Sequence, residues 1–97
     1  MTSKAEAVSR VENGEVRVTE WRFAPGAETG WHRHEYDYVV VPLMDGRLRI
    51  VASDGESTAE LKQGTAYFRK AGIEHNVINA GDTDLAFVDV ELVEHPG

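Results

Sequence analysis

The feature that most constrains this chain is a dense series of turn signals with only short apolar stretches between them. The stretches are rich in β-branched residues and alternate in polarity, and none carries a helical period long enough for three turns. The turn signals pair glycine with asparagine, proline or aspartate, at Asn13-Gly14, Pro25-Gly26, Asp45-Gly46, Asp54-Gly55 and Gly81-Asp82. Seven or eight short strands separated by turns predict an all-β sandwich or barrel.

The chain of 97 residues is long enough for one hydrophobic core but not for two. We predict an N-terminal lead-in over residues 1–14, a single β-domain over residues 15–93 and a C-terminal tail over residues 94–97. No internal repeat, low-complexity segment or linker divides the sequence.

Charge and composition narrow the choice of partners. The formal net charge of −7 argues against a nucleic-acid or an anionic-membrane partner, since either would require a basic face. Because the chain has no cysteine, a disulfide framework, thiolate ligands and a cysteine nucleophile are excluded. The first residues lack the apolar core of a signal peptide, and no run reaches membrane-spanning length. A cytoplasmic location is therefore expected.

The stretch Val16–Phe23 changes its alternation midway, since its two valines have one parity whereas Trp21 and Phe23 have the other. A β-bulge at Glu20-Trp21 would reconcile the two halves. We expect this strand to lie at the edge of a sheet, where a second copy of the chain would cover it in a homodimer.

Two other segments carry specific expectations. Asp45-Gly46 stands between apolar runs and predicts a two-residue hairpin turn into a strand over Arg47–Ala52. Such a turn needs positive φ, which the glycine accepts freely. The strand over Leu85–Val93 alternates, with valines on one face and Asp89 and Glu91 on the other.

His32 and His34 stand two residues apart, just ahead of a β-branched run. Side chains of a strand alternate with a period of two, so both imidazoles would project from one face. Two imidazoles aimed at one point form a metal site if a third ligand arrives from elsewhere. The alternative is a pair of surface histidines on a loop, because this spacing alone is a weak signal.

Two longer stretches resemble the motifs of the cupin family. GTAYFRKAGIEHNVIN, residues 64–79, resembles the second motif, G-x5-P-x-G-x2-H-x3-N, with Lys70 in place of the proline and matches at Gly64, Gly72, His75 and Asn79. The stretch over residues 26–46 resembles the first motif through Gly26, His32, His34 and Gly46. The glutamate of the first motif is missing, because Tyr38 or Val39 stands at its position. The resemblance implies a single-domain cupin jelly-roll β-barrel.

The cupin resemblance also implies that His32, His34 and His75 converge on one divalent metal ion inside the barrel. In ligand count the site is similar to the three-histidine cupins, among them thiol dioxygenases and β-diketone-cleaving enzymes, which use ferrous iron. Fe²⁺ is therefore favoured, with Mn²⁺, Ni²⁺ or Zn²⁺ as alternatives. Without the glutamate, three neutral imidazoles leave the ion its full charge, which favours a small anionic substrate. A metal-free barrel with hydrogen-bonded histidines is the alternative.

Other residues of the two motifs are candidates for the rest of the site. Tyr38 is the candidate catalytic residue, near the ion but not a ligand, because a phenol with a pKa of about 10 is a poor donor beside imidazole. The alternative is that Tyr38 is simply a packed aromatic ring. Tyr36, Tyr67 and Asn79 are the candidates for substrate binding.

Three functions are compatible with these features. The first is a metal enzyme, an oxygenase or a lyase acting on a small acid. The second is a module that binds a small ligand with or without metal, and the third is a structural barrel that acts through its dimer. The run YDYVVVPLMDG also resembles small bacterial cupins found with β-alanine breakdown genes, which indicates a catabolic context.

Overall fold

The computed structural model describes residues 3–93, and these residues form nine β-strands and no helix, so the predicted all-β fold is confirmed. The strands in chain order are β1 (Glu6–Glu12), β2 (Val16–Phe23), β3 (His32–Arg33), β4 (Tyr38–Pro42), β5 (Gly46–Ala52), β6 (Gly55–Leu61), β7 (Tyr67–Arg69), β8 (Glu74–Asn79) and β9 (Leu85–Leu92). Over this range no helix could cross a membrane. The predicted tail over residues 94–97 lies outside the described residues.

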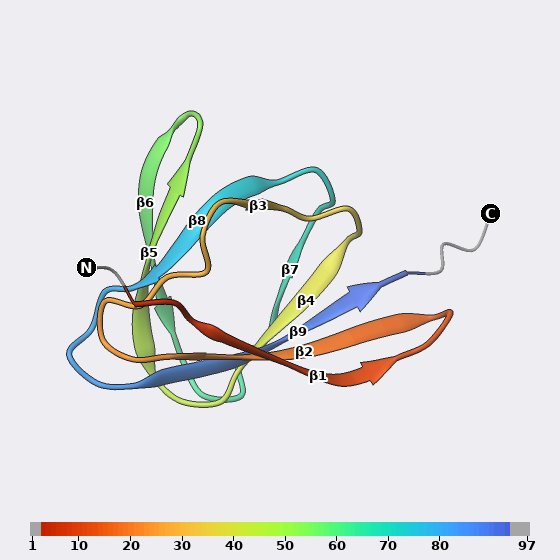
Figure 1. The fold of residues 1–97 in the computed structure, drawn as a ribbon, viewed down its shortest axis with the longest axis horizontal. Coiled ribbons are helices and arrows are strands. Elements are labelled where there is room, and N and C mark those ends of the chain that lie inside the picture. Colours follow the sequence, from red (N-terminus) through yellow and green to blue (C-terminus); the bar gives the residue numbers. More distant parts are fainter. Residues whose placement is uncertain (1–2, 94–97) are drawn as a thin grey trace.

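The strands form two antiparallel sheets that face each other (Figure 1). The larger sheet has the order β1-β2-β9-β4-β7, and the smaller has the order β3-β8-β5-β6. The chain passes repeatedly from one sheet to the other, so strands that follow each other, such as β8 and β9, lie in opposite sheets. The inner faces of the two sheets therefore carry residues from distant parts of the sequence.

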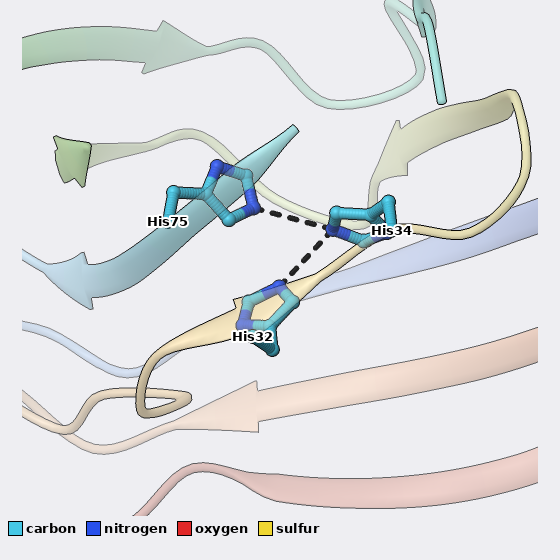
Figure 2. A group of neighbouring side chains, drawn as sticks. All are labelled: His32, His34 and His75. Carbon is cyan, nitrogen blue, oxygen red and sulfur yellow. Dashed lines mark hydrogen bonds between the residues drawn. The ribbon is translucent and has the colours of Figure 1, made fainter. Parts of the chain in front are cut away.

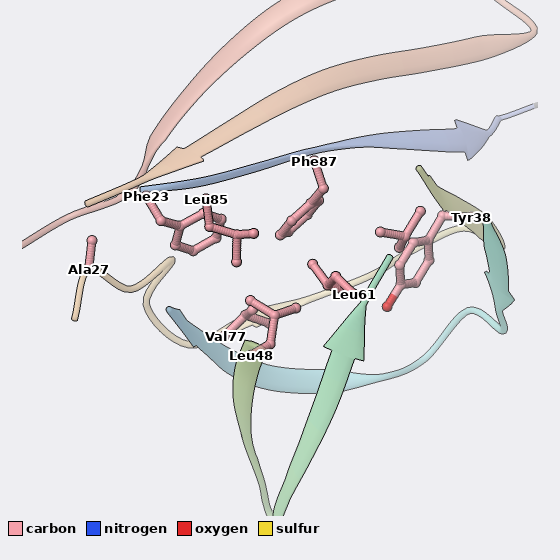
Figure 3. Close-up of a cluster of buried hydrophobic side chains, with 9 residues drawn as sticks. Phe23, Ala27, Tyr38, Leu48, Leu61, Val77, Leu85 and Phe87 are labelled. Atoms are coloured by element: carbon pink, nitrogen blue, oxygen red, sulfur yellow. The ribbon is translucent and has the colours of Figure 1, made fainter. Parts of the chain in front are cut away.

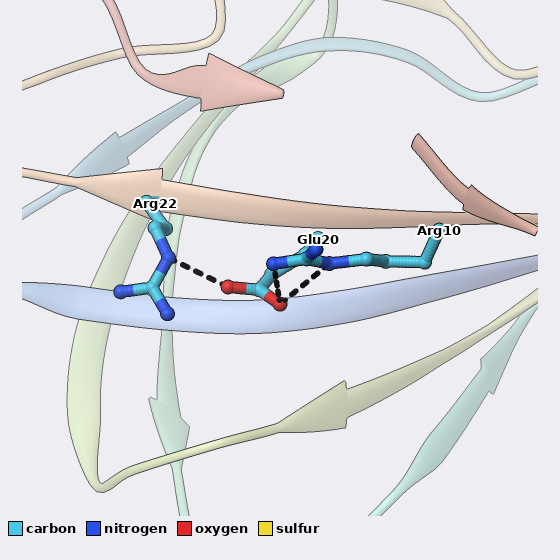
Figure 4. Close-up of polar contacts among 3 residues, drawn as sticks. All are labelled: Arg10, Glu20 and Arg22. Atoms are coloured by element: carbon cyan, nitrogen blue, oxygen red, sulfur yellow. Dashed lines mark hydrogen bonds and ion pairs between the residues drawn. The ribbon is translucent and has the colours of Figure 1, made fainter. Parts of the chain in front are cut away.

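The segment predicted to precede the domain contributes a strand, because β1 pairs with β2 along its whole length. Charge also fixes this edge strand. Glu20 of β2, only 8% exposed, lies between Arg10 of β1 and Arg22, at N–O distances of 3.1 and 2.6 Å (Figure 4). Two guanidinium groups thus compensate one buried carboxylate. The larger sheet begins at Glu6, while the domain boundaries at residues 15 and 93 stay a prediction.

Two expectations about β2 are wrong. The strand lies between β1 and β9 rather than at the edge of its sheet. Its pairing with β9 runs from Val16 to Phe23 without a register shift, so there is no bulge in this pairing. The irregularity lies instead in β1, between Ser9 and Val11.

The change of parity in β2 reflects depth within the molecule. Arg17 and Thr19 line the outer mouth between the sheets, whereas Phe23, on the same face, is 1% exposed in the interior. Trp21 lies between these two environments. One face of the strand therefore changes from polar to aromatic along its length, and the apolar alternation shifts without a bulge.

Of the two Asp-Gly dipeptides, one forms a hairpin turn and the other does not. Asp54-Gly55 forms the expected turn between β5 and β6, which pair as far as Ala52 and Gly55, with φ of 131° at the glycine. The hairpin prediction for Asp45-Gly46 is wrong, because β4 and β5 belong to opposite sheets. Gly46 does not have positive φ; instead, a Cβ atom there would overlap the side chain of Leu85. This glycine is needed for close packing rather than for turn geometry.

The hydrophobic core lies between the two sheets (Figure 3). Phe23 of β2 and Phe87 of β9 pack with ring centroids 5.4 Å apart and an interplanar angle of 33°, an arrangement that stabilises aromatic pairs. Leu48 of β5 and Val77 of β8 contribute from the smaller sheet. The core adjoins the cavity, because Leu48, Val77 and Phe87 also line it.

Candidate metal centre

The three histidines come together through the pairing of β3 with β8. His32 of β3 lies directly opposite His75 of β8 in the antiparallel register. Directly opposed residues point to the same face, and His34, two residues further on, shares the face of His32. The period-two spacing that predicted convergence therefore operates here, and residues from two segments meet inside the molecule.

The loop before β8 holds His34 through its backbone. The His34 amide donates to the Ile73 carbonyl at 2.9 Å, and the Gly72 amide donates to the His34 carbonyl at 2.8 Å. Asp37 accepts a hydrogen bond from the Ala71 amide at 2.8 Å, so it fixes the same loop. Lys70, at the position of the family's proline, is exposed and pairs with Asp37 at 3.5 Å. Residues 70–73 of the second motif are thereby tied to His34 and Asp37 of the first.

The three Nε2 atoms face one another (Figure 2). The Nε2 atom of His34 lies 3.0 Å from that of His32 and 3.2 Å from that of His75. An ion about 2.1 Å from each nitrogen would place neighbouring nitrogens about 3.0 Å apart at right angles and about 3.4 Å apart at the tetrahedral angle. Both distances are those of neighbouring ligands of one ion, and the ligand atoms of all three residues lie within 4.8 Å of one another, so the three residues are positioned to hold a metal.

Hydrogen bonding assigns the ligand atom of His32. Its Nδ1 lies 2.9 Å from the Gly30 carbonyl oxygen, which can only accept, so Nδ1 carries the hydrogen and Nε2 keeps its lone pair. Thr29 supports this arrangement, since its hydroxyl donates to the same carbonyl at 2.8 Å. The Gly30 amide is held by Asn76 Oδ1 at 2.9 Å. Such contacts orient an imidazole toward a metal.

The donor set fits a cation better than it fits hydrogen bonds alone. The Nε2 atom of His34 can carry only one hydrogen, yet it lies within hydrogen-bond distance of two other Nε2 atoms. Burial, followed by the neighbouring histidines, lowers the pKa of His34 to about 4. Burial, followed by His32 and Arg69, lowers the pKa of His75 to about 4 as well. Both imidazoles are therefore neutral at pH 7, with lone pairs available for an ion.

The histidines line one side of a cavity of about 200 Å³ between the sheets. Tyr38 and Tyr67 line the same cavity. Tyr38 stacks on His34 with ring centroids 3.9 Å apart and an interplanar angle of 17°. Burial, followed by the charge of Asp89, raises the pKa of Tyr38 above its usual range, so the phenol keeps its proton. Burial also raises the pKa of Tyr67.

The structure does not bring the other two candidate residues into the cavity. Tyr36 is half-buried outside the cavity lining, with the guanidinium of Arg17 5.8 Å from its ring centroid. Asn79 is 2% exposed and contacts backbone atoms: its amide donates to the Thr83 carbonyl at 2.8 Å, and its Oδ1 accepts from the Gly81 amide at 3.0 Å. The Asn79 side chain thus holds the loop between β8 and β9.

Sequence reasoning missed three residues that contribute to the site. Thr29 supports His32, as described above. Trp21 lines the cavity and stacks on His32 with centroids 6.3 Å apart and an interplanar angle of 21°. Asp89 also lines the cavity, and burial, followed by the charge of Glu91, raises its pKa to about 7. The signal that could have revealed Asp89 is the acidic face of an otherwise apolar strand.

Residues 19–91 match the family described as "Cupin domain", and the chain belongs to this family. The "Beta-alanine degradation protein BauB" of Pseudomonas aeruginosa is 57% identical over 94 residues, which cover 95% of this chain and 99% of that protein. An "Oxalate-binding protein" of Thermotoga maritima is 30% identical over 72 residues, covering 74% of this chain and 58% of that protein. A cupin domain from Bordetella pertussis has a crystal structure that matches with a TM-score of 0.93 and 48% identity, covering 95% of this chain and 96% of that one.

Proposed function

We propose that this cupin is a metal-dependent enzyme in which His32, His34 and His75 hold one divalent ion. The observation that carries the proposal is the approach of their Nε2 atoms at 3.0 and 3.2 Å. All three side chains are neutral donors, so the ion would keep its charge and several open positions. Fe²⁺ is the ion we favour, with Mn²⁺, Ni²⁺ or Zn²⁺ as alternatives. The bound ion would act as a Lewis acid and, if it is iron, would support oxygen chemistry.

The substrate we propose is a small anion, and the reaction is that of an oxygenase or a lyase. The cavity of about 200 Å³ admits only a compact molecule. Tyr38 lies against His34 with its phenol protonated, so its role is to donate a hydrogen bond rather than to ligate the ion. Tyr67 would contact the substrate from the neighbouring strand. The 57% identity to a β-alanine degradation protein supports a substrate from the breakdown of small amino or carboxylic acids.

A second candidate function is the binding of a small ligand without turnover. The similarity to an oxalate-binding protein supports it, because the name of that relative describes binding. Elemental analysis of the purified protein, followed by oxygen-uptake measurements with candidate acids, separates the two functions. Retained metal with substrate-dependent oxygen uptake supports an oxygenase. Ligand-dependent thermal stabilisation with neither oxygen uptake nor substrate cleavage supports a binding protein.

We also propose a homodimer, formed through the outer face of the larger sheet. Residues opposed in register form an apolar row across this face, from Val11 of β1 through Val18, Val90 and Val39 to Phe68 of β7. Val11 and Phe68 are 42% and 48% exposed. Covering such a row would remove exposed apolar surface. Light scattering at high protein concentration tests the proposal, and a monomer mass would contradict it.

A further inference from the structure

The larger sheet carries a buried carboxyl group on the cavity wall that no part of the metal site uses. Asp89 of β9 is 6% exposed and lines the cavity together with the histidines and tyrosines. Its neighbours in register are Thr19 of β2 and Val40 of β4, neither of which carries a charge. A carboxyl group in such surroundings is costly to the fold unless its oxygens are satisfied.

Only part of the hydrogen-bonding capacity of Asp89 is used. The indole N–H of Trp21 donates to the carboxyl group. The other oxygen, Oδ1, is buried and has no hydrogen-bond partner among the described residues. Arg69, the cation that lines the cavity, lies over the Tyr67 ring at 4.4 Å. A buried acceptor without a partner in a cavity is an unfilled position for a hydrogen-bond donor.

Trp21 contacts both His32 and Asp89. Its ring stacks on His32, and its indole N–H bonds to the carboxyl group of Asp89. The cavity lining therefore offers two kinds of binding group. The histidines would hold a cation, which attracts an anionic group, and Asp89 accepts a hydrogen bond from a donor.

We infer that Asp89 is a specificity-determining residue that accepts a hydrogen bond from an N–H or O–H group of the ligand. The ligand is then a short amino acid or hydroxy acid whose carboxylate lies at the ion held by the histidines. This inference rests on the proposed function, since it places the anionic end of the ligand at the ion. It adds the second functional group that the ligand must carry.

The test compares three acids of equal length with protein loaded with Mn²⁺: propanoate, 3-hydroxypropanoate and 3-aminopropanoate. Calorimetry gives their affinities for the wild type, and elemental analysis gives the metal content. We expect the amino or the hydroxy acid to bind at least about tenfold more tightly than propanoate, as is typical of a hydrogen bond to a charged group. Of these two acids, the one that binds more tightly shows whether the donor to Asp89 is an amino or a hydroxyl group.

Three variants locate this preference. Asp89→Leu removes the acceptor at similar volume and should reduce the preference to within about threefold while metal content stays unchanged. Asp89→Asn keeps an acceptor but not the charge, so it should weaken the amino acid more than the hydroxy acid. Glu91→Gln is the matched control, because Glu91 lies two residues further along the same face, at the mouth, and its change should leave the preference intact.

Each result supports or overturns the inference. Equal binding of the three acids to the metal-loaded wild type, or binding of none, overturns it and leaves the metal site standing. A preference that survives Asp89→Leu, or that Glu91→Gln abolishes, also overturns it. A wild type that retains no ion under any loading condition refutes the proposed function, and the inference fails with it. Metal content and ligand preference therefore report the two failures separately.

Discussion

The two sheets that enclose the cavity contribute different chemistry to it. The smaller sheet supplies His32 and His75, whose ring nitrogens face one another, with Nδ1 of His32 bonded to the backbone. The larger sheet supplies Tyr38 and Asp89, which keep their protons more readily than usual because they are buried. In the proposed function, the histidines of one wall hold a cation and the side chains of the other contact an organic ligand. Metal binding and ligand selection would then be altered by different substitutions.

The largest effect is expected on metal content when one histidine is removed from the smaller sheet. His75→Ala leaves two imidazoles, too few to hold an ion against water, so metal content should fall to background. Tyr38→Phe is the matched control from the opposite wall, because it keeps the ring that stacks on His34 and removes only the hydroxyl. Metal analysis of both variants decides the point.

Both outcomes of this experiment are informative. Tyr38→Phe should retain the ion and change only ligand affinity or turnover. If Tyr38→Phe loses the metal, the phenol is a fourth ligand and the division between the walls is wrong. Unchanged metal content in His75→Ala would refute the three-histidine site.

A second, smaller effect is expected where the two sheets approach each other. Gly46→Val would place side-chain atoms where Leu85 of the larger sheet already lies. We expect a loss of about 1–3 kcal/mol in the free energy of unfolding, as overpacking typically costs. Denaturant unfolding measures it. Gly46→Val combined with Leu85→Ala should recover part of the loss, and no recovery would show that steric overlap is not the cause.

A third effect is expected from Asp89 of the larger sheet, whose ionisation should make the free energy of unfolding depend on pH. Asp89 has its pKa raised to about 7, whereas in the unfolded chain it ionises near its usual value of about 4. Between these values the unfolded chain releases the proton and the folded chain does not, so stability falls as the pH rises through this window. Asp89→Asn cannot ionise and should be more stable than the wild type at high pH, by about 1–2 kcal/mol.

Unfolding of both proteins at about pH 4 and about pH 8 measures this difference, which should nearly vanish at the lower pH. The other ionisable groups around Asp89, namely Glu91, Tyr38 and Tyr67, remain in both proteins. The low pKa values of His34 and His75 destabilise wild type and variant alike on acidification. A stability difference that does not change with pH would contradict the assignment.

The smallest effect is expected for an acidic residue on an outer face. Glu56 pairs with Arg49 at 2.7 Å, but the two side chains are 55% and 49% exposed. Solvent screens such a pair, so Glu56→Gln should leave the melting temperature unchanged within error. A clear shift in the melting temperature would show that surface charge contributes as much as the charge inside the cavity.

The histidine site could be predicted from the sequence because its signals are local. A period of two places His32 and His34 on one face, and the spacing around His75 matches a family motif. The role of Asp89 could not be predicted in this way. Alternation distinguishes two faces of a strand but does not say which is internal, and a polar face usually meets water. Here the face of β9 that carries Asp89 lines the cavity between the sheets, so this acidic side chain points inward.

The turns show that local sequence patterns also predict the fold only in part. The all-β class followed from the turn signals, and Asp54-Gly55 forms its hairpin. The identical dipeptide at Asp45-Gly46 leads the chain from one sheet to the other. A hairpin depends on whether the flanking strands pair, and here β4 and β5 pair with other strands in opposite sheets. Local sequence identifies where the chain turns but not which strand it meets next.

The central position of β9 has a consequence for the order in which the protein matures. β9 lies between β2 and β4 and carries Asp89, yet of the nine described strands it leaves the ribosome last. Until it arrives, β2 and β4 both present unpaired, valine-rich edges, which are prone to associate with other chains. At this stage the cavity also lacks the part of its lining that β9 contributes. We therefore expect a nascent chain stalled before Leu85 to depend on chaperones.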